Sequence, residues 1–274
     1  MHQSVIDSWH AYSQPLEGRV NSLYLDVLGL VTTGVGNLVD PISLAERLPW
    51  TLEDRTKADL AQLRADWHKL KDNAEYYSKR HWRFARDATK VRLTDEAIDS
   101  LVASKRAEFE TFLKSHYFRE WDTFPADAQL GIMSMAWACG PGFPLKFANF
   151  RRAVLAQDWT GAVASCKIRE AGNPGVVPRN KHNRLCFANA ALVKEHGLDP
   201  SQLYWPNPAP VGFPGAPSAA SNEAHAAADA AQVALNHFVT VERERFLSEG
   251  PSAARDMRDF EEADDPGEPS SPNT

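Results

Sequence analysis

The sequence predicts an α+β fold that is mainly α-helical and contains a small β-hairpin. Residues 26–37 combine β-branched side chains with Gly29, Gly34 and Gly36, which is typical of a tight hairpin. Elsewhere, apolar residues recur at steps of three and four, as on one face of a helix. With 274 residues, 43% of them hydrophobic, the chain can bury a substantial core.

Two carboxylates flank this hairpin. We expect Glu17 to open a short helical segment that includes Val20, Leu23 and Tyr24, and Asp26 to begin the β-rich run. One acid should therefore lie on a helix and the other on the sheet. Two carboxylates in different environments are what glycosidic bond cleavage requires, one protonated and one ionised. Taken by spacing alone, they equally fit a helix-terminal charge and a turn residue.

A second helical region follows between residues 38 and 93. The pattern Thr51-x-x-Asp54 predicts its helix start, as a capping box does. Trp50 fits either a sugar-stacking platform or a packing residue. The helix should bury one apolar stripe, formed by Leu60, Leu63, Trp67 and Leu70.

Residues 76–92 interleave six Lys and Arg side chains with Tyr76, Tyr77, Trp82 and Phe84. This mixture fits a solvated helix face with aromatic residues beneath it, or a surface that contacts a sugar polymer. Nucleic-acid binding would use the same residue types, but the chain carries a net charge of −6 and no nucleic-acid-binding motif. We therefore expect no nucleic-acid partner.

Residues 128–139 predict a buried helix whose core positions are Ile132, Met135, Ala136 and Cys139. The three cysteines, Cys139, Cys166 and Cys186, have no metal-type spacing, so they predict free, buried thiols. Neither C-x-x-C nor H-E-x-x-H occurs, and G-x-S-x-G is also missing. We expect no metal, no cofactor and no serine triad.

The order of residues around the hairpin resembles the active-site segment of phage-type lysozymes, glycoside hydrolase family 24. It reads E-G from Glu17, then Y-x-D ending at Asp26, then G-x-x-T-x-G-x-G-N-L. The resemblance continues through LTDEAIDSL at 93–101, where Thr94 fits the N-cap of a long helix, then through 128–159 and 172–187. It spans residues 17–190, the length of a whole domain.

The resemblance implies that Glu17 is the general acid, that Asp26 positions or activates water, and that the Thr32 hydroxyl lies beside that water. Thr33 is an alternative, because adjacent strand residues face opposite sides. The implied mechanism is inverting, with the carboxyl groups roughly 6.5–9.5 Å apart. Glu17 would then need a raised pKa, which partial burial and a nearby ionised Asp26 would provide. The Asp/Thr pair favours hydrolysis over a lytic transglycosylase route.

The implied activity is that of a muramidase, which cleaves the β-1,4 bond between N-acetylmuramic acid and N-acetylglucosamine in peptidoglycan. The substrate-binding residues implied are Thr33, Gly36, Asn37, Trp137 and Arg179. Asn37 stands where the family has a histidine. Because asparagine carries no charge, the structural ion pair that the family would form there is not expected. Core packing would also explain Trp137. Two alternatives are a non-catalytic wall-binding protein on the same fold and a glycosidase for chitin-like polymers.

Arg179, with Asn180 and Arg184, belongs to the segment that resembles the family's closing motif. These residues fit a role beside the ligand, or one of tying a loop to a helix by hydrogen bonds.

The implied architecture is a two-lobed lysozyme-like domain with a small β-hairpin lobe and a cleft. It would occupy residues 1–206, with a helical insertion at about 40–90. A Pro/Ala-rich linker at 207–221 would lead to a C-terminal helix at 222–249 and a disordered acidic tail at 250–274.

The N-terminal residues lack the basic start and apolar core of a secretory signal, and no stretch approaches the ~20 apolar residues that span a bilayer. We expect synthesis in the cytoplasm without a signal peptide, no transmembrane segment, and action on peptidoglycan in the periplasm or cell wall after delivery. A bacteriolytic effector and a phage lysis enzyme both fit. The acidic tail fits a solubilising terminus, or a segment that an immunity or delivery protein binds.

Overall fold

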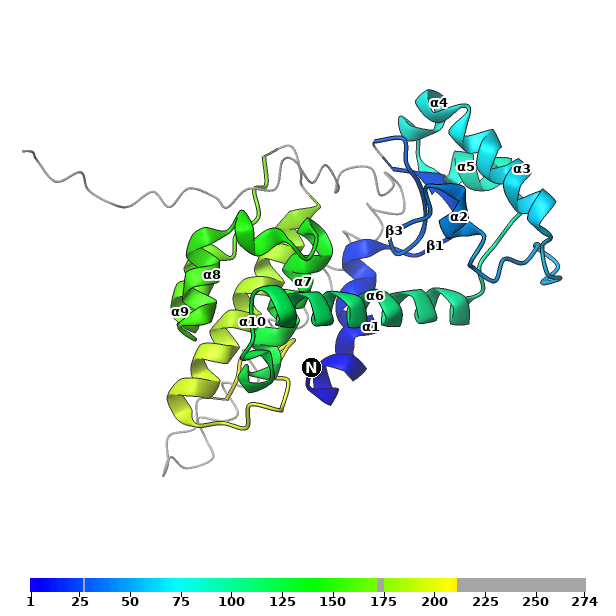
Figure 1. The fold of residues 1–274 in the computed structure, drawn as a ribbon. Coiled ribbons are helices and arrows are strands. Elements are labelled where there is room, and N and C mark those ends of the chain that lie inside the picture. The colour runs from blue at the N-terminus through cyan, green and yellow to red at the C-terminus, as the bar shows by residue number, and fades with distance from the viewer. Residues whose placement is uncertain (27, 172–174, 211–274) are drawn as a thin grey trace, which may run out of the picture. The chain divides into compact units, whose positions relative to one another are not determined.

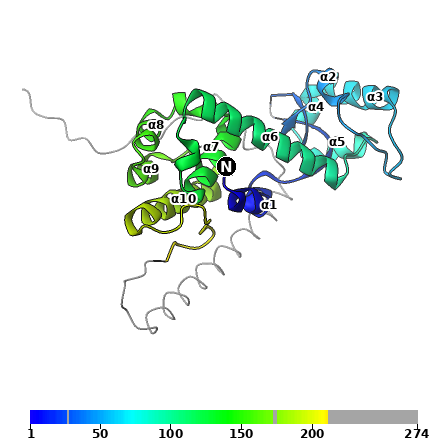
Figure 2. The same cartoon turned by 60° about the horizontal axis from the view of Figure 1, so that its bottom comes forward.

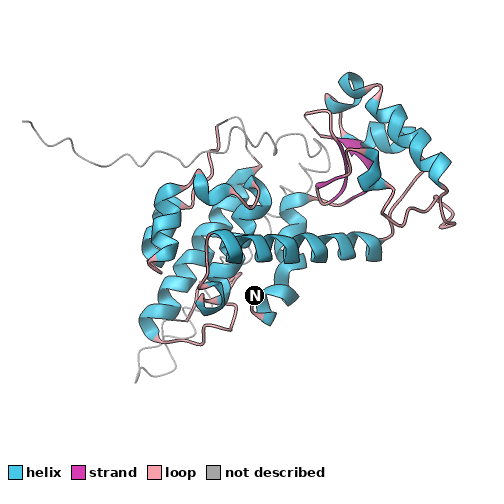
Figure 3. Ribbon diagram, in the orientation of Figure 1, coloured by secondary structure: helices cyan, strands magenta, loops and turns pink. Residues whose placement is uncertain are grey.

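The computed structural model describes residues 1–26, 28–171 and 175–210, which are mainly helical with a small antiparallel sheet of three strands (Figures 1 and 3). They form two compact units: an N-terminal unit of residues 6–112, and a C-terminal unit of residues 1–5 and 113–210. The predicted helix at 222–249 and the acidic tail lie outside the described residues, as does the linker beyond residue 210.

The sheet belongs to the N-terminal unit and has the strand order β1-β2-β3, with β1 (Val20–Leu25), β2 (Val31–Gly34) and β3 (Asn37–Leu38). Tyr24 pairs with Thr32, and Thr33 pairs with Asn37. Positive φ at Gly34 (65°) and Gly36 (79°) allows the tight turn between β2 and β3. The predicted hairpin is therefore confirmed.

The segment before the hairpin differs from our expectation. Glu17 does not open a helix; it is the last residue of α1 (Gln3–Glu17), and the following residues form β1. Val5, Trp9 and Tyr12 lie on one stripe of α1 and are buried. Because Gly18 has a φ of 67°, the chain can leave the helix at once and enter the strand.

Four helices follow the sheet: α2 (Ile42–Ala45), α3 (Leu60–Lys71), α4 (Ala74–Ser78) and α5 (Trp82–Ala88). Helices α3, α4 and α5 all contact β1, and Figure 2 shows them gathered beside the strands. The predicted helix start at Thr51 is wrong, because Asp59 caps α3 by accepting a hydrogen bond from the Gln62 amide at 2.7 Å. Thr51 instead makes β-bridges to Lys57 and Arg92.

Helix α3 buries Leu63, Trp67 and Leu70 as predicted, whereas Leu60 is 52% exposed. Leu60 is the first residue of the helix, and the buried stripe begins at Leu63, three residues later than predicted. Trp67 fixes the helix to the sheet region, since its indole nitrogen donates to the Val39 carbonyl at 2.9 Å.

Helix α6 (Asp95–His116) follows the cap that the sequence predicts. The Thr94 hydroxyl accepts a hydrogen bond from the Ala97 amide at 3.2 Å, which satisfies one of the first-turn amides. Arg19, just before β1, forms ion pairs with Asp95 and Asp99 at 2.9 and 2.8 Å. These pairs hold the start of α6 beside the start of β1.

The C-terminal unit has its core between α7 (Ala126–Cys139) and α10 (Val176–His196). The predicted core positions Ile132, Met135, Ala136 and Cys139 are all buried, and all three cysteines are free and buried. The remaining helices of this unit are α8 (Ala148–Leu155), α9 (Trp159–Ser165) and two 3₁₀ turns, η1 (Trp121–Thr123) and η2 (Phe143–Leu145).

Gly131 brings α7 and α10 close together. A Cβ atom at this position would lie 2.7 Å from Cζ of Phe187, which is fully buried.

No helix in the described residues is both long and apolar enough to cross a bilayer.

Candidate active site

Asp26 directly follows β1 and organises the turn that leads to β2. Its Oδ1 atom accepts hydrogen bonds from the amides of Leu28 (2.9 Å) and Leu30 (2.8 Å). Its carbonyl accepts a further bond from Gly29, whose φ of 73° is one that a residue without Cβ adopts readily. Asp26 lies at the end of the strand and is only partly buried.

Thr32 is bonded to the same turn from β2. Its hydroxyl donates to the Leu30 carbonyl at 3.1 Å, and the Leu30 amide donates to Asp26. Leu30 therefore connects the two side chains, and the turn fixes the carboxylate and the hydroxyl together.

The Thr33 hydroxyl is bonded elsewhere. It donates to the buried Ser22 carbonyl at 3.0 Å, and Thr33 is fully buried. This bond joins β2 to β1 and gives Thr33 a structural role. The two adjacent threonines thus differ in what their hydroxyls bind, a distinction that the sequence leaves open.

Glu17 lies in the same unit, at the C-terminal end of α1, and is 7% exposed. Only two residues separate it from β1. The two predicted acids therefore occupy different environments: a largely buried glutamate at a helix end, and a partly exposed aspartate in a turn.

Gly36 lies in the turn between β2 and β3, and Asn37 is the first residue of β3. The Asn37 Oδ1 atom accepts a hydrogen bond from the Val35 amide at 3.2 Å, so it closes the turn locally. A Cβ atom on Gly34 would lie 3.0 Å from that oxygen. The Gly36 carbonyl accepts a hydrogen bond from Lys105 of α6 at 3.3 Å.

A lysine that the sequence analysis did not single out supports the Asp26 turn. Lys71, the last residue of α3, donates to the Gly29 carbonyl at 3.1 Å and to Asp40 Oδ2 at 2.6 Å. The same Asp40 oxygen accepts a bond from the Val31 amide at 3.3 Å. The pair thus braces both the turn and the start of β2.

Trp137 and Arg179, the other predicted substrate-binding residues, lie in the C-terminal unit. Trp137 is in α7 and is 4% exposed. Arg179 is on α10, is buried, and donates to the Ser134 carbonyl (3.0 Å) and hydroxyl (3.2 Å). Arg179 therefore ties α10 to α7.

Two of the open alternatives now have a structural answer. Trp50 is buried and its indole donates to the Ala45 carbonyl at 2.8 Å, so it is a packing residue. Asn180 exchanges hydrogen bonds with both the amide and the carbonyl of Ile168, at 2.9 and 2.8 Å, and so ties a loop to α10.

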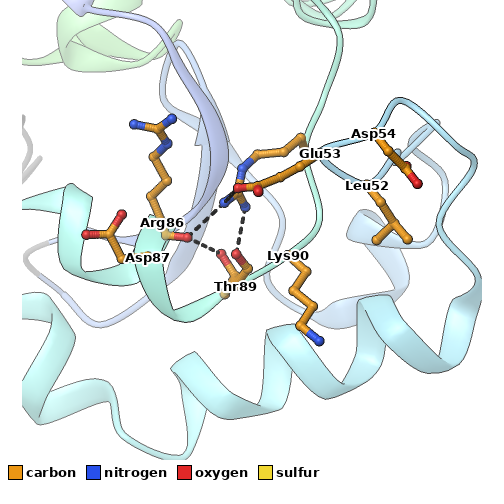
Figure 4. A pocket seen from close by; sticks show the side chains of 8 residues that line it. Leu52, Glu53, Asp54, Arg86, Asp87, Thr89 and Lys90 are labelled. Carbon is orange, nitrogen blue, oxygen red and sulfur yellow. Dashed lines mark hydrogen bonds and ion pairs between the residues drawn. The ribbon is translucent and has the colours of Figure 1, made fainter.

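A pocket of about 600 Å³ lies beside α5 in the N-terminal unit (Figure 4). Arg92 forms part of its wall, held by Glu53 at 2.9 Å and by the Thr89 carbonyl at 2.8 Å. The pocket contains none of the predicted catalytic residues. Its lining comprises Leu52, Glu53, Asp54, Arg86, Asp87, Thr89, Lys90 and Arg92.

Within the described ranges, no group of three or more His, Cys, Asp or Glu side chains could hold a metal ion. Comparison of the chain with protein-family models finds no match, and comparison with curated proteins also finds none.

Proposed function

We propose that this protein is a peptidoglycan hydrolase of the muramidase type. The observation that carries the proposal is the connection of Asp26 and Thr32 through Leu30, in the unit that also holds the largely buried Glu17. The three residues follow one another in the order and spacing of the phage-type lysozyme segment. A carboxylate and a hydroxyl fixed on one turn are a suitable pair for orienting a water molecule.

In the proposed reaction, protonated Glu17 donates its proton to the glycosidic oxygen while the bond from that oxygen to C1 of N-acetylmuramic acid breaks. Water forms the new bond to C1 from the opposite face, and Asp26 accepts the water's proton. The Thr32 hydroxyl fixes the position of that water. The configuration at C1 is inverted, and a reducing-end N-acetylmuramic acid is released.

The binding residues belong to the same proposal. Gly36, in the tight turn just before Asn37, lets a glycan strand approach the backbone, since glycine presents no side chain. Thr33 contributes by holding β2 against β1. The resemblance also implies substrate-binding roles for Trp137 and Arg179, both of which are buried within the C-terminal unit.

The lysozyme-like, two-lobed fold is likewise a proposal. It is supported by a small sheet in one unit and a buried helix pair, α7 and α10, in the other. The helices between β3 and α6 are additional to the minimal pattern of the family. They favour a bacteriolytic effector or a tail-associated phage enzyme that is delivered to the cell wall.

Product analysis tests this function. Digestion of purified peptidoglycan should release muropeptides that end in reducing N-acetylmuramic acid. Anhydro-muramic products would instead indicate a lytic transglycosylase, and free peptides an amidase. A protein that binds the wall and releases nothing would be a binding protein.

A further inference from the structure

Helices α4 and α5 present an exposed stack of alternating aromatic and cationic side chains. The guanidinium of Arg80 lies 3.9 Å from the ring centre of Tyr76 and 5.6 Å from that of Phe84. Tyr76 is 48% exposed and Phe84 is 50% exposed. Two large rings therefore stand half in solvent with a cation held between them.

The surrounding segment is strongly cationic. Residues 76–92 contain six Lys and Arg side chains and one carboxylate, Asp87, in a chain whose net charge is −6. Arg92 is buried and used for structure, and Lys79 pairs with Glu75. Arg86 and Lys90 are exposed, and in Figure 4 they extend in different directions from the pocket beside α5.

The first residue of α4 adjoins the turn that carries Asp26. A Cβ atom on Gly29 would lie 3.5 Å from Cβ of Ala74, the first residue of α4. Lys71, three residues before Ala74, bonds the Gly29 carbonyl. Both views of the fold place α4 beside this turn (Figures 1 and 2). The start of α4 therefore lies beside the turn that carries Asp26.

We propose that Tyr76, Arg80 and Phe84 form an accessory binding site for peptidoglycan strands. The inference rests on the proposed function, because it assumes that the polymer held at Asp26 is peptidoglycan. Peptidoglycan matches this surface in two ways. The apolar faces of its sugar rings stack on exposed aromatic rings, and the carboxylates of its peptide stems pair with arginine. A neutral glycan such as chitin offers only the first contact.

Binding to insoluble material tests this site without requiring catalysis. Retention on purified sacculi is measured for full-length Glu17→Gln protein, and then for the same protein with Tyr76→Ala, Arg80→Ala and Phe84→Ala added. A second variant, Arg80→Glu alone, reverses one charge and keeps both rings. The matched control is Arg47→Ala, an exposed arginine of the same unit outside this face. Circular dichroism confirms that each variant is folded.

The triple substitution should weaken retention on sacculi about tenfold or more, and Arg80→Glu should weaken it in the same direction. Arg47→Ala should bind like its parent, and chitin should retain the parent less than sacculi do. Unchanged retention in both the triple variant and Arg80→Glu would overturn the inference. A parent that does not bind sacculi would overturn it as well. The inference would also be overturned if the parent bound single-stranded DNA more tightly than sacculi and the same substitutions abolished that binding. The face would then be a nucleic-acid surface. Because the protein tested is catalytically disabled, lost hydrolysis and lost retention remain separate results.

Discussion

The carboxylate of Asp26 and the hydroxyl of Thr32 are fixed to one residue, Leu30, whose amide donates to Asp26 at 2.8 Å and whose carbonyl accepts from Thr32 at 3.1 Å. The relative position of the two groups is therefore set by one turn of backbone. Lys71 of α3 braces the same turn from outside it, through the Gly29 carbonyl.

The two adjacent threonines should respond differently to loss of the hydroxyl. Thr32→Val should lower kcat roughly tenfold to a hundredfold, because the proposed water loses one of the groups that orient it. Thr33→Val should lower stability by about 1–3 kcal/mol, because the buried Ser22 carbonyl loses its donor. Muropeptide release and urea unfolding, measured on both variants, check this. If Thr33→Val lowered kcat and Thr32→Val did not, Thr33 would be the functional residue.

Lys71 should act as a positioning residue for the Asp26 turn. Lys71→Met removes the bonds to the Gly29 carbonyl and to Asp40, so the turn should loosen and kcat should fall roughly tenfold. Faster hydrogen exchange at the Leu28 and Leu30 amides would report the loosening directly. Arg64→Met, which breaks an exposed ion pair on the same helix, is the control and should change neither quantity. Unchanged exchange in Lys71→Met would refute the positioning role.

Gly131 should be required for the packing of α7 against α10. Gly131→Ala would place its Cβ 2.7 Å from the Phe187 ring, and that ring also packs edge-on against Phe150 at 5.1 Å. We expect a loss of about 1–3 kcal/mol from overpacking, despite the roughly 1 kcal/mol that alanine gains in a helix. Gly142→Ala meets nothing closer than 4.0 Å and should be nearly neutral. Equal unfolding midpoints for the two variants would contradict this.

Acid should destabilise the C-terminal unit through His182. Burial lowers the pKa of His182 from 6.5 to about 4, and the neighbouring charges of Arg179 and Lys181 act in the same direction. Its Nδ1 atom accepts a hydrogen bond from the Trp205 indole at 2.9 Å, which only the neutral ring can do. The unfolded chain therefore binds a proton below pH 6.5 that the folded chain refuses until about pH 4, and stability falls over that window.

Between pH 7 and pH 5, His182 should lower the free energy of unfolding by about 2 kcal/mol. His182→Gln should remove that loss, whereas His196→Gln, on the exposed end of the same helix, should retain it. Burial raises the pKa of Asp127 to about 6. The folded chain therefore binds this proton more readily than the unfolded chain, and Asp127 makes the protein more stable as the pH falls. Because Asp127 is present in every variant, only the difference between proteins is compared. Equal acid sensitivity in wild type and His182→Gln would contradict the assignment.

The sequence predicts the elements whose signal is local. β-Branched residues and glycines predict the hairpin, Thr94 predicts the start of α6, and the apolar run predicts buried α7. The start of α3 is missed because Thr51-x-x-Asp54 imitates a cap, although Thr51 bridges Arg92, far along the chain. Helix α1 had a usable signal in Val5, Trp9 and Tyr12, which lie four and three residues apart.

The candidate site divides in the same way. The spacing of Glu17, Asp26 and Thr32 is visible in the sequence, but the connection of Asp26 and Thr32 through Leu30 depends on how the turn folds. The brace at Lys71 joins residues that lie 31 and 42 positions apart, so no local pattern indicates it. Long-range hydrogen bonds of this kind are fixed by tertiary packing alone.

The most direct test of the muramidase proposal is the release of reducing muropeptides from purified peptidoglycan by wild type, Glu17→Gln and Glu108→Gln. Glu108 is an exposed glutamate of α6 in the same unit, so its substitution controls for the change of charge. We predict that Glu17→Gln lowers the rate at least about a hundredfold at matched folding, because the leaving oxygen loses its proton donor, and that Glu108→Gln leaves it unchanged. Undiminished release by Glu17→Gln, or no release by the wild type, would contradict the proposal.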